Sequence, residues 1–385
     1  MSYWNSKRKY IDISSKTLFV KPFFTHTHTH TQHKFNILQM CRTSSKITGM
    51  ICIDLVLILF FLFISLILAL SFSEWPLINQ NGSILITGSS SGIGLSAAKR
   101  LHSEGFHIYA AYRKEKDFHM LQTLGLTPIL LDVTNSKQID DAVNTIKQSK
   151  YPLVGIINNA GSTTKKPLEF VTMSKVKQVF DVNVLGALEV TQKFLPLLRE
   201  TINTKGMQDE ENTDADSGID GIGKYNGARI VFIGSVSGII SLPLNGVYSM
   251  TKYSMEAMAD TFRRELYKFG IAVSMVNPAY VNTNFRQKGE ATIQNLDEKE
   301  KEFYGQEFNK LEKKMKKRVG FAAKCCDVTD DAIVDAVMSK YPRTRYYPAV
   351  VAPHVPAWVM TPIIRMFGVF TFTDRLLDLV VLRFF

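Results

Sequence analysis

The pattern of hydrophobic and polar positions divides the chain into a long apolar run near the N-terminus, a central region of short alternating elements and an apolar C-terminal stretch. In the central region, apolar runs typical of buried strands lie at 83–87, 107–112, 127–132, 153–158 and 229–233. Helical patterns lie between them at 95–105 and 136–149. Strands separated by helices of this length predict an α/β fold with a doubly wound parallel sheet.

The apolar run at 51–72 is about as long as a helix needs to be to cross a bilayer, and Asp54 is its only charged residue. It is too long for the core of a signal peptide, and no small-residue cleavage site follows it. The sequence therefore predicts a transmembrane anchor over 50–73, with a buried helix of a soluble core as the alternative. The preceding segment, 1–49, is polar and basic without an apolar period, which predicts disorder.

The charges that flank the apolar run predict its orientation. Lys34, Arg42 and Lys46 precede the run, whereas Glu74 is the nearest charge after it. By the positive-inside tendency, the N-terminus faces the cytosol and the domain that follows faces the lumen. We therefore expect a single-pass membrane protein, with the endoplasmic reticulum as its location.

Two further segments depart from the alternating pattern. The stretch 201–228 is acidic and rich in glycine, so we expect an exposed loop inserted ahead of the strand at 229–233. The stretch 351–385 is apolar but is interrupted by prolines and arginines, which argues against a second membrane span. It predicts an amphipathic lid or a membrane-interfacial segment, with packing into the core as the alternative.

The net charge of +11 is compatible with a nucleic acid, an anionic membrane surface or an anionic cofactor as partner. The lysines and arginines are spread along the chain, and their densest run, 313–318, lies in a helical segment that also carries glutamates. This mixture favours a solvated helix face, and we expect no nucleic-acid partner. The four cysteines lack metal-ligand spacing, so we expect neither a metal site nor a disulfide framework.

The first candidate for chemistry is a glycine-rich turn that follows the first predicted strand and opens a helix. Glycines let the backbone approach a pyrophosphate closely, and the helix N-terminus offers unpaired amides. The turn contains Thr87, Gly88, Ser90, Gly92, Ile93 and Gly94. Many loops share such a composition, so the other motifs of the chain decide whether it binds a dinucleotide.

The TGxxxGIG spacing of that turn resembles the short-chain dehydrogenase/reductase family, and further motifs follow in that family's order across most of residues 80–350. They are Asp132-Val133 after the third strand, Asn158-Asn159-Ala160-Gly161 after the fourth, Asn183 in DVNVLGAL, Ser235 in IGSVSG, and Tyr248 with Lys252 in YSMTK. The resemblance implies a Rossmann-type fold and an NAD(P)-dependent oxidoreductase. It also implies cofactor contacts at Asp132, Val133, Asn159, Ala160 and Gly161.

Tyr248 and Lys252 are four residues apart, so on one helix they share a face. The unperturbed pKa of tyrosine is about 10, and a neighbouring ammonium favours the phenolate and lowers that pKa. We therefore expect Tyr248 to act as the acid and base and Lys252 as its electrostatic partner. The resemblance implies that Lys252 also holds the nicotinamide ribose, that Ser235 donates a hydrogen bond to the substrate oxygen, and that Asn183 supports a water linking Lys252 to solvent.

The choice of cofactor depends on the end of the second strand. An acidic residue there binds the ribose 2′-hydroxyl of NAD, whereas an arginine accommodates the 2′-phosphate of NADP. The sequence has Tyr112 and then Arg113, which favours NADP, with NAD as the alternative. After the sixth strand, Pro278 and Thr283 match the family's loop over the nicotinamide, while Ala279 replaces its usual glycine.

The segment YPRTRY at 341–346 resembles the retinol and hydroxysteroid dehydrogenase branch of the family. Members of this branch often carry an N-terminal membrane helix, and the resemblance implies a hydrophobic alcohol or ketone as substrate. It is also compatible with a homodimer. Two alternatives remain open: a dinucleotide-binding protein without redox activity, and an enzyme for a small hydroxy acid such as 3-hydroxybutyrate.

Overall fold

The computed structural model of the protein describes residues 58–62, 75–206, 227–279, 281, 283, 285, 297–319, 326–348, 350–352 and 355–356. The chain forms two compact units, Met1–Phe72 and Ser73–Phe385. In the first unit, residues 58–62 are helical and their apolar side chains are exposed. No helix within the described ranges is long and apolar enough to cross a membrane. Most of the predicted anchor and all of 1–49 lie outside those ranges.

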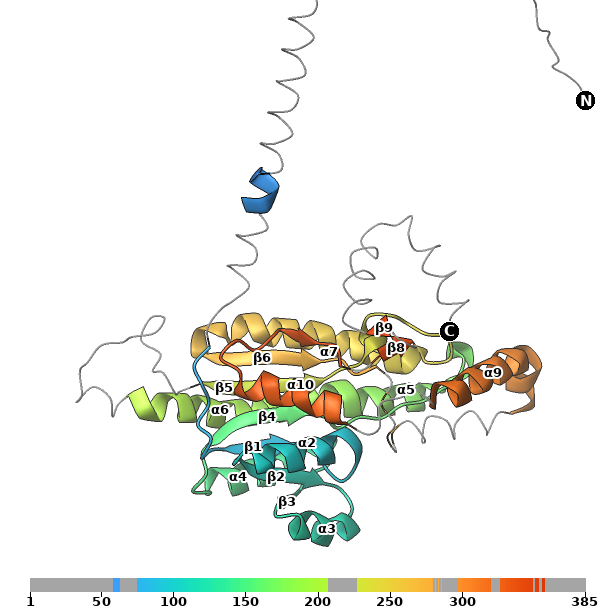
Figure 1. The fold of residues 1–385 in the computed structure, drawn as a ribbon. Coiled ribbons are helices and arrows are strands. Elements are labelled where there is room, and N and C mark those ends of the chain that lie inside the picture. The colour runs from blue at the N-terminus through green and yellow to red at the C-terminus, as the bar shows by residue number, and fades with distance from the viewer. Residues whose placement is uncertain are drawn as a thin grey trace, which may run out of the picture. The chain divides into compact units, whose positions relative to one another are not determined.

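Seven strands form one parallel sheet in the second unit (Figure 1). They are β1 (Ser83–Ile86), β2 (His107–Tyr112), β3 (Thr127–Leu130), β4 (Leu153–Asn158), β5 (Ala228–Ile233), β6 (Ile271–Val276) and β7 (Arg345–Tyr346). Their order across the sheet is β3-β2-β1-β4-β5-β6-β7. The order reverses between β1 and β4, and doubly wound sheets bind ligands at such a switch point. The predicted parallel sheet is confirmed.

Helices cover both faces of this sheet (Figure 1). The α-helices are α2 (Gly92–Ser103), α3 (Phe118–Thr123), α4 (Ser136–Lys147), α5 (Met173–Phe180), α6 (Gly186–Gly206), α7 (Gly246–Glu265), α9 (Glu298–Val319) and α10 (Asp327–Met338). A π-helix, η3 (Asp181–Leu185), joins α5 to α6. A short 3-10 helix, η6 (Val236–Gly238), follows β5.

Two apolar clusters pack against the faces of the sheet, because side chains alternate along each strand. Leu85 of β1 belongs to the cluster that includes α4, α6 and α7, whereas Ile84 and Ile86 belong to the cluster with α2, α3 and α10. Phe194 of α6 and Leu101 of α2 are fully buried on the two faces. Each such side chain contributes about 1.5–3 kcal/mol on burial, so both faces hold their helices firmly.

The start of α2 and the start of the predicted loop 201–228 differ from the structure. Helix α2 begins at Gly92 rather than at 95, because the glycine-rich turn itself enters the helix. Helix α6 continues to Gly206, so the first residues of the predicted loop 201–228 are helical. Ile202 packs against the core there, and Thr201 Oγ1 donates to the Leu153 carbonyl at 2.9 Å. The remainder of the insertion, 207–226, lies outside the described residues.

The domain begins before the predicted boundary at residue 80. Arg229 is 1% exposed, and its Nη2 donates to the carbonyls of Pro76 at 2.8 Å and Ser339 at 3.2 Å. The Trp75 N–H donates to the Lys340 carbonyl at 2.9 Å. Burial lowers the pKa of Arg229 to about 10. These contacts tie the chain from Trp75 onward to β5 and to the segment that leads into β7.

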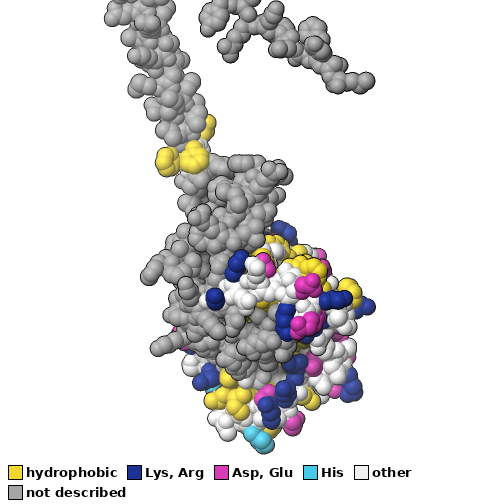
Figure 2. Space-filling view, turned by 90° about the vertical axis from the view of Figure 1, so that its right-hand side faces the viewer, with side chains coloured by type: hydrophobic (Ala, Val, Ile, Leu, Met, Phe, Trp, Pro, Cys, Tyr) yellow, Lys and Arg dark blue, Asp and Glu magenta, His cyan; other side chains and the backbone are white. Residues whose placement is uncertain are grey.

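The last described residues of the chain form two short strands. Strands β8 (Val350–Ala352) and β9 (Val355–Pro356) form an antiparallel pair, and residues 357–385 lie outside the described ranges. Cys326 is disulfide-bonded, a bond that the expectation of no disulfide framework did not include, because sequence spacing carries no signal for a pairing that folding brings about. Its partner is not among the described residues, which contain no other cysteine. Figure 2 shows basic and acidic side chains intermingled on one face.

Candidate active site

The glycine-rich turn connects β1 to α2 at the carboxyl edge of the sheet. Gly88 and Gly92 have φ angles of 67° and 59°, a left-handed conformation that disfavours residues with side chains. A Cβ atom on Gly94 would lie 2.3 Å from Asn159 Nδ2 and 2.6 Å from the Gly88 carbonyl oxygen. Each of the three glycines is therefore required for a steric reason.

Thr87 and Asn159 hold this turn against the end of β4. Thr87 Oγ1 accepts the backbone N–H groups of Asn159 and Ala160, both at 3.0 Å. Asn159 Nδ2 donates to the carbonyls of Thr87 at 2.8 Å and Gly88 at 3.1 Å. Two motifs more than 70 residues apart in the sequence thus lie side by side, and the turn is fixed by neutral hydrogen bonds.

The N-terminus of α2 is open beside the turn. The cap residue Ser91 makes no side-chain hydrogen bond to the helix, and the first turn carries no acidic residue. Ser90 and Ile93 are partly exposed next to it. Uncapped amides and the positive end of the helix dipole favour an anion. Together with the space left by the missing Cβ atoms, these groups fit the pyrophosphate of a dinucleotide.

Arg113 and Asp132 lie together at the ends of β2 and β3. Arg113 Nη1 is 3.6 Å from Asp132 Oδ2, and the two side chains are 57% and 29% exposed. An exposed ion pair of this length adds little to stability. The Arg113 guanidinium can therefore leave Asp132 and bind another anion. The next residue, Val133, is buried, and a Cβ atom on Gly186 would lie 2.7 Å from its carbonyl oxygen.

Ser235, Tyr248 and Lys252 converge where β5 ends and α7 begins. Ser235 lies close enough to Tyr248 for its side chain to lower the pKa of the phenol. Ser235 Oγ accepts the Ser237 N–H at 3.1 Å, which leaves its own O–H to donate to the phenol oxygen. Lys252 is 4% exposed, and its Nζ donates to the Ile233 carbonyl at 2.7 Å. The same Nζ lies 5.6 Å from the centre of the Tyr248 ring.

Burial governs how these groups ionise. Burial raises the pKa of Tyr248 to about 12, although the hydrogen bond from Ser235 acts to lower it. Burial also lowers the pKa of Lys252 to about 7. The expected lowering of the Tyr248 pKa by Lys252 is therefore wrong for this arrangement. The Lys252 ammonium bonds to a backbone carbonyl, and desolvation of the phenolate outweighs its field.

Asn183 is fully buried within the π-helix η3. Its Oδ1 accepts the Ser162 N–H at 2.6 Å, and its Nδ2 donates to the Ser162 carbonyl and to Thr251 Oγ1, both at 2.9 Å. Thr251 Oγ1 donates in turn to the Tyr248 carbonyl at 2.7 Å. A π-helical turn often marks a functional position. Here its asparagine links the segment after β4, which includes Gly161, to the helix that carries Tyr248.

The segment after β6 returns to the glycine-rich turn. A Cβ atom on Gly92 would lie 3.4 Å from Thr283 Cβ, so Thr283 is close to the start of α2. The Pro278 carbonyl accepts the Val236 N–H at 3.2 Å. Ala279 does not have a positive φ angle, so alanine replaces the family's glycine here without backbone strain. The predicted cofactor residues thus surround one edge of the sheet.

A buried polar chain next to Ser235 was not predicted from the sequence. Asn277 Oδ1 accepts the Ser235 N–H at 2.9 Å, and Asn277 Nδ2 donates to Glu256 Oε1 at 2.5 Å. Glu256 Oε2 accepts from Arg345 Nε at 2.7 Å. The ring of Phe285 also lies 5.7 Å from that of Tyr248. The position of Asn277 directly after β6 was the one available signal, since it places the residue at the same edge as Ser235.

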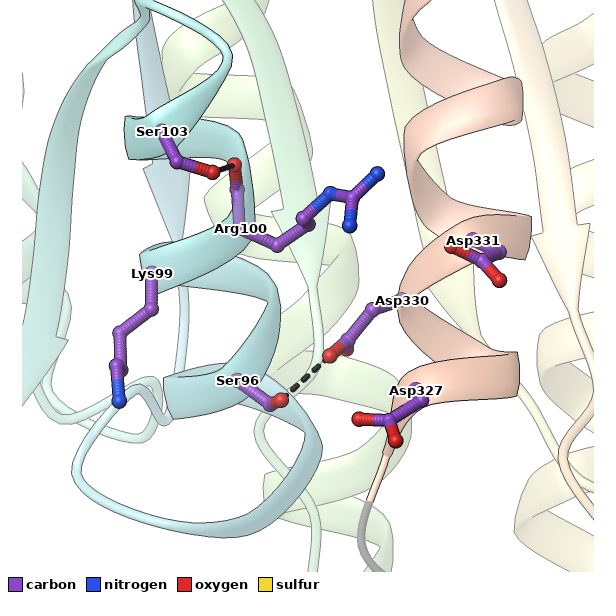
Figure 3. A pocket seen from close by; sticks show the side chains of 7 residues that line it. All are labelled: Ser96, Lys99, Arg100, Ser103, Asp327, Asp330 and Asp331. Carbon is purple, nitrogen blue, oxygen red and sulfur yellow. Dashed lines mark hydrogen bonds between the residues drawn. The ribbon is translucent and has the colours of Figure 1, made fainter.

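A separate pocket lies between α2 and α10 (Figure 3). Its lining consists of Ser96, Lys99, Arg100, Ser103, Asp327, Asp330 and Asp331. Ser96 Oγ donates to Asp330 Oδ2 at 2.5 Å. Asp330 is 6% exposed, and burial raises its pKa to about 6. This lining includes none of the predicted site residues, so the pocket is distinct from the dinucleotide edge.

Comparisons with known proteins show which family the chain belongs to. The sequence profile described as short chain dehydrogenase matches residues 83–207 and 218–294. The uncharacterized oxidoreductase YbbO of Escherichia coli is 34% identical over 204 residues, which cover 53% of this chain and 67% of that protein. Retinol dehydrogenase 7 of Rattus norvegicus is 33% identical over 281 residues, or 69% and 80% of the two chains. Mitochondrial D-beta-hydroxybutyrate dehydrogenase of Mus musculus is 30% identical over 286 residues, or 69% and 76%.

Proposed function

Because the chain belongs to the short-chain dehydrogenase/reductase family and is an oxidoreductase acting on CH–OH groups, we propose that its substrate is a hydrophobic alcohol or ketone. In this proposal Ser235, Tyr248 and Lys252 carry the chemistry beside an NADP bound at the glycine-rich turn. The observation that carries the proposal is the convergence of Ser235 and Tyr248 at the carboxyl edge with buried Lys252, whose Nζ lies 5.6 Å from the centre of the Tyr248 ring.

The chain's own residues move and hold a proton. The bound dinucleotide supplies or accepts the hydride. In the direction of reduction, the Tyr248 hydroxyl gives its proton to the carbonyl oxygen of the substrate, and in oxidation it takes that proton back. The Ser235 hydroxyl donates a hydrogen bond to the same oxygen, and Lys252 donates to the hydroxyls of the nicotinamide ribose. Asn183 keeps the segment after β4 and α7 in register.

The ionisation of Tyr248 sets the pH dependence of the two directions. With a pKa raised to about 12 by burial, the phenol is protonated at neutral pH, and this is the form that reduces a carbonyl. Alcohol oxidation requires the phenolate. We therefore expect the rate of oxidation to rise with pH throughout the neutral range. The rate of reduction should stay nearly level there and fall only as the pH approaches the pKa of the Tyr248 phenol.

The choice of NADP rests on Arg113. Its guanidinium lies at the end of β2, more than half exposed, where a ribose 2′-phosphate would stand in a bound dinucleotide. Asp132, which Arg113 faces at 3.6 Å, follows β3 rather than β2, so it does not occupy the position from which an acidic residue binds the ribose hydroxyl of NAD. The arginine comes first after the strand and carries the charge that a phosphate requires, so it favours NADP.

Two relatives suggest different substrates. A retinol dehydrogenase is 33% identical and a hydroxybutyrate dehydrogenase is 30% identical to the chain. The ring of Phe285 beside Tyr248 favours an apolar substrate over a short hydroxy acid. A screen of the full-length protein against retinoids, steroids, 3-ketosphinganine and 3-hydroxybutyrate, with NADP(H) and NAD(H), tests the proposal. Turnover of 3-hydroxybutyrate alone would establish the second candidate, and dinucleotide binding without any turnover would indicate a silent member of the family.

We also propose that the apolar run at 51–72 anchors the protein in the endoplasmic reticulum membrane. Its length matches a bilayer and it contains one charge. Carbonate washing of microsomes should leave the full-length protein in the pellet, and release into the supernatant would show that the run does not span. Protease treatment of sealed microsomes tests the orientation separately, because protection is expected only for a lumenal domain.

A further inference from the structure

We infer that Glu256 is a positioning residue for the proposed catalytic serine: with Arg345, it fixes the orientation of the Asn277 amide that holds the Ser235 backbone. The inference rests on the proposed roles of Ser235 and Tyr248. Its basis is a continuous chain of hydrogen bonds from β7 to the end of β5. The chain runs from Arg345 Nε to Glu256 at 2.7 Å, from Asn277 Nδ2 to Glu256 at 2.5 Å, and from the Ser235 N–H to Asn277 Oδ1 at 2.9 Å.

The hydrogen bonds of this network are buried, so the loss of any one of them is costly. Asn277 is fully buried and Glu256 is 7% exposed, while the Arg345 side chain is 15% exposed. Arg345 Nη2 also lies 2.8 Å from Asp260 Oδ2. A buried polar group without its partner is destabilising, so the groups of this chain hold one another in one arrangement. A Cβ atom on Gly234 would lie 1.9 Å from Asn277 Oδ1, which shows how closely the amide fits against the residue before Ser235.

The carboxylate determines which way the Asn277 amide faces. An ionised carboxylate only accepts hydrogen bonds, whereas a side-chain amide has one accepting oxygen and one donating nitrogen. Facing Glu256, the Asn277 amide must present its nitrogen to the carboxylate. Its oxygen is then left for the Ser235 N–H. Arg345 Nε donates to the other carboxylate oxygen of Glu256 at 2.7 Å, so both oxygens of Glu256 accept hydrogen bonds.

The orientation of Asn277 reaches the reacting group through Ser235. The Ser235 hydroxyl donates to Tyr248, and this hydrogen bond lowers the pKa of the phenol against the opposing effect of burial. A serine whose backbone is no longer held would donate less well. Loss of the Glu256 carboxylate should therefore change the pH dependence of the enzyme as well as its rate, which a general loss of packing would not do.

The test compares four variants of the full-length protein in detergent micelles. Glu256→Gln keeps the shape but can donate to Asn277 and allow its amide to turn. Glu256→Asp keeps an accepting carboxylate and serves as the rescue. Glu265→Gln removes an exposed carboxylate from the same helix, α7, and is the matched control. Ser235→Ala is the benchmark for the proposed function.

Two measurements are made on each variant. The first is hydrogen–deuterium exchange of the Ser235 amide, resolved by fragmentation of the peptide over 233–237, and it requires no substrate. The second is the pH profile of kcat for oxidation of all-trans-retinol with NADP. For Glu256→Gln we expect faster exchange at Ser235, a kinetic pKa moved upward, and a kcat about tenfold lower at neutral pH, the size of one well-placed hydrogen bond.

The outcomes separate the inference from the proposed function. The inference holds if Glu256→Gln shows these changes while Glu256→Asp recovers much of the wild-type behaviour and Glu265→Gln keeps the wild-type exchange and profile. Wild-type exchange and profile in Glu256→Gln, with Ser235→Ala impaired, would overturn the inference alone. Equal changes in Glu256→Gln and Glu265→Gln would also overturn it. Full activity in Ser235→Ala would instead refute the proposed function. The exchange measurement would still test whether Glu256 holds Asn277 against the Ser235 amide.

Discussion

The glycine-rich turn and the surroundings of Ser235 lie at the same edge of the sheet, yet they are held in different ways. Thr87 and Asn159 fix the turn through neutral side-chain to backbone hydrogen bonds, and missing Cβ atoms give it its shape. Ser235 is held by an asparagine that depends on a buried ion pair. Changes at the turn should therefore act through shape and binding, and changes around Ser235 through ionisation and rate.

The largest expected effect is the loss of the proposed proton donor. Tyr248→Phe removes the hydroxyl but keeps the ring, so kcat should fall by about a thousandfold or more while dinucleotide binding stays nearly unchanged. Tyr253→Phe is the matched control, because Tyr253 lies on the same helix but is 43% exposed. Steady-state kinetics and dinucleotide titration give the two readouts. Turnover of Tyr248→Phe within tenfold of wild type would remove this residue from the mechanism.

The turn should respond through binding instead. In Gly94→Ala the added Cβ would meet Asn159 Nδ2 at 2.3 Å and the Gly88 carbonyl at 2.6 Å. The neighbours must shift, and we expect dinucleotide affinity to fall about ten- to hundredfold. Gly305→Ala is the control, since a Cβ there meets nothing within 4 Å. Calorimetric titration measures the dinucleotide affinity of both variants. Equal affinities would show that the glycine-rich turn has no steric role in binding.

A smaller effect is expected where the two cofactors differ. Arg113→Ala should weaken NADP(H) roughly tenfold, the size of one charge-assisted contact, and leave NAD(H) nearly unchanged. Arg264→Ala, which removes an exposed arginine from α7, controls for the loss of charge alone. The measurement is the dissociation constant of each dinucleotide. An equal response of both dinucleotides to Arg113→Ala, or a wild type that prefers NAD(H), would contradict the assignment.

The smallest expected effect lies outside both regions, in the pocket between α2 and α10 (Figure 3). The pKa of Asp330 is raised to about 6 by burial, above the value of about 4 for an unfolded aspartate. Its contribution to stability is thus fully present below pH 4 and is lost as the pH rises through 6. Asp330→Asn should stabilise the protein by about 1 kcal/mol more at pH 8 than at pH 5.

Thermal unfolding at the two pH values measures this difference. Asp331→Asn is the control, because Asp331 lines the same pocket but is exposed. A stabilisation of Asp330→Asn that is the same at both pH values would show that removing a negative charge, rather than the titration of a buried carboxyl, is responsible.

The sequence predicted the fold more completely than the connections within the site. Strands β2 and β4 begin and end where their apolar runs do, because a central parallel strand is buried on both faces. The two-residue strand β7 was too short to produce a pattern. The motifs predicted that Ser235, Tyr248 and Lys252 come together, but not that the Lys252 ammonium bonds to the Ile233 carbonyl. Contacts such as that of Glu256 with Arg345, 89 residues apart, arise only from the tertiary fold.

The buried guanidinium of Arg229 limits where the chain can be cut. Its Nη2 donates to the carbonyls of Pro76 and Ser339. The first residues of the domain therefore supply a hydrogen-bond acceptor for a charge buried in the domain interior. A truncated protein that starts after Pro76 would leave this cation short of an acceptor, and a hydrogen bond to a charged group contributes about 1.5–3 kcal/mol. A soluble form made for crystallisation should therefore begin no later than Trp75, immediately after the segment that such a truncation is meant to remove.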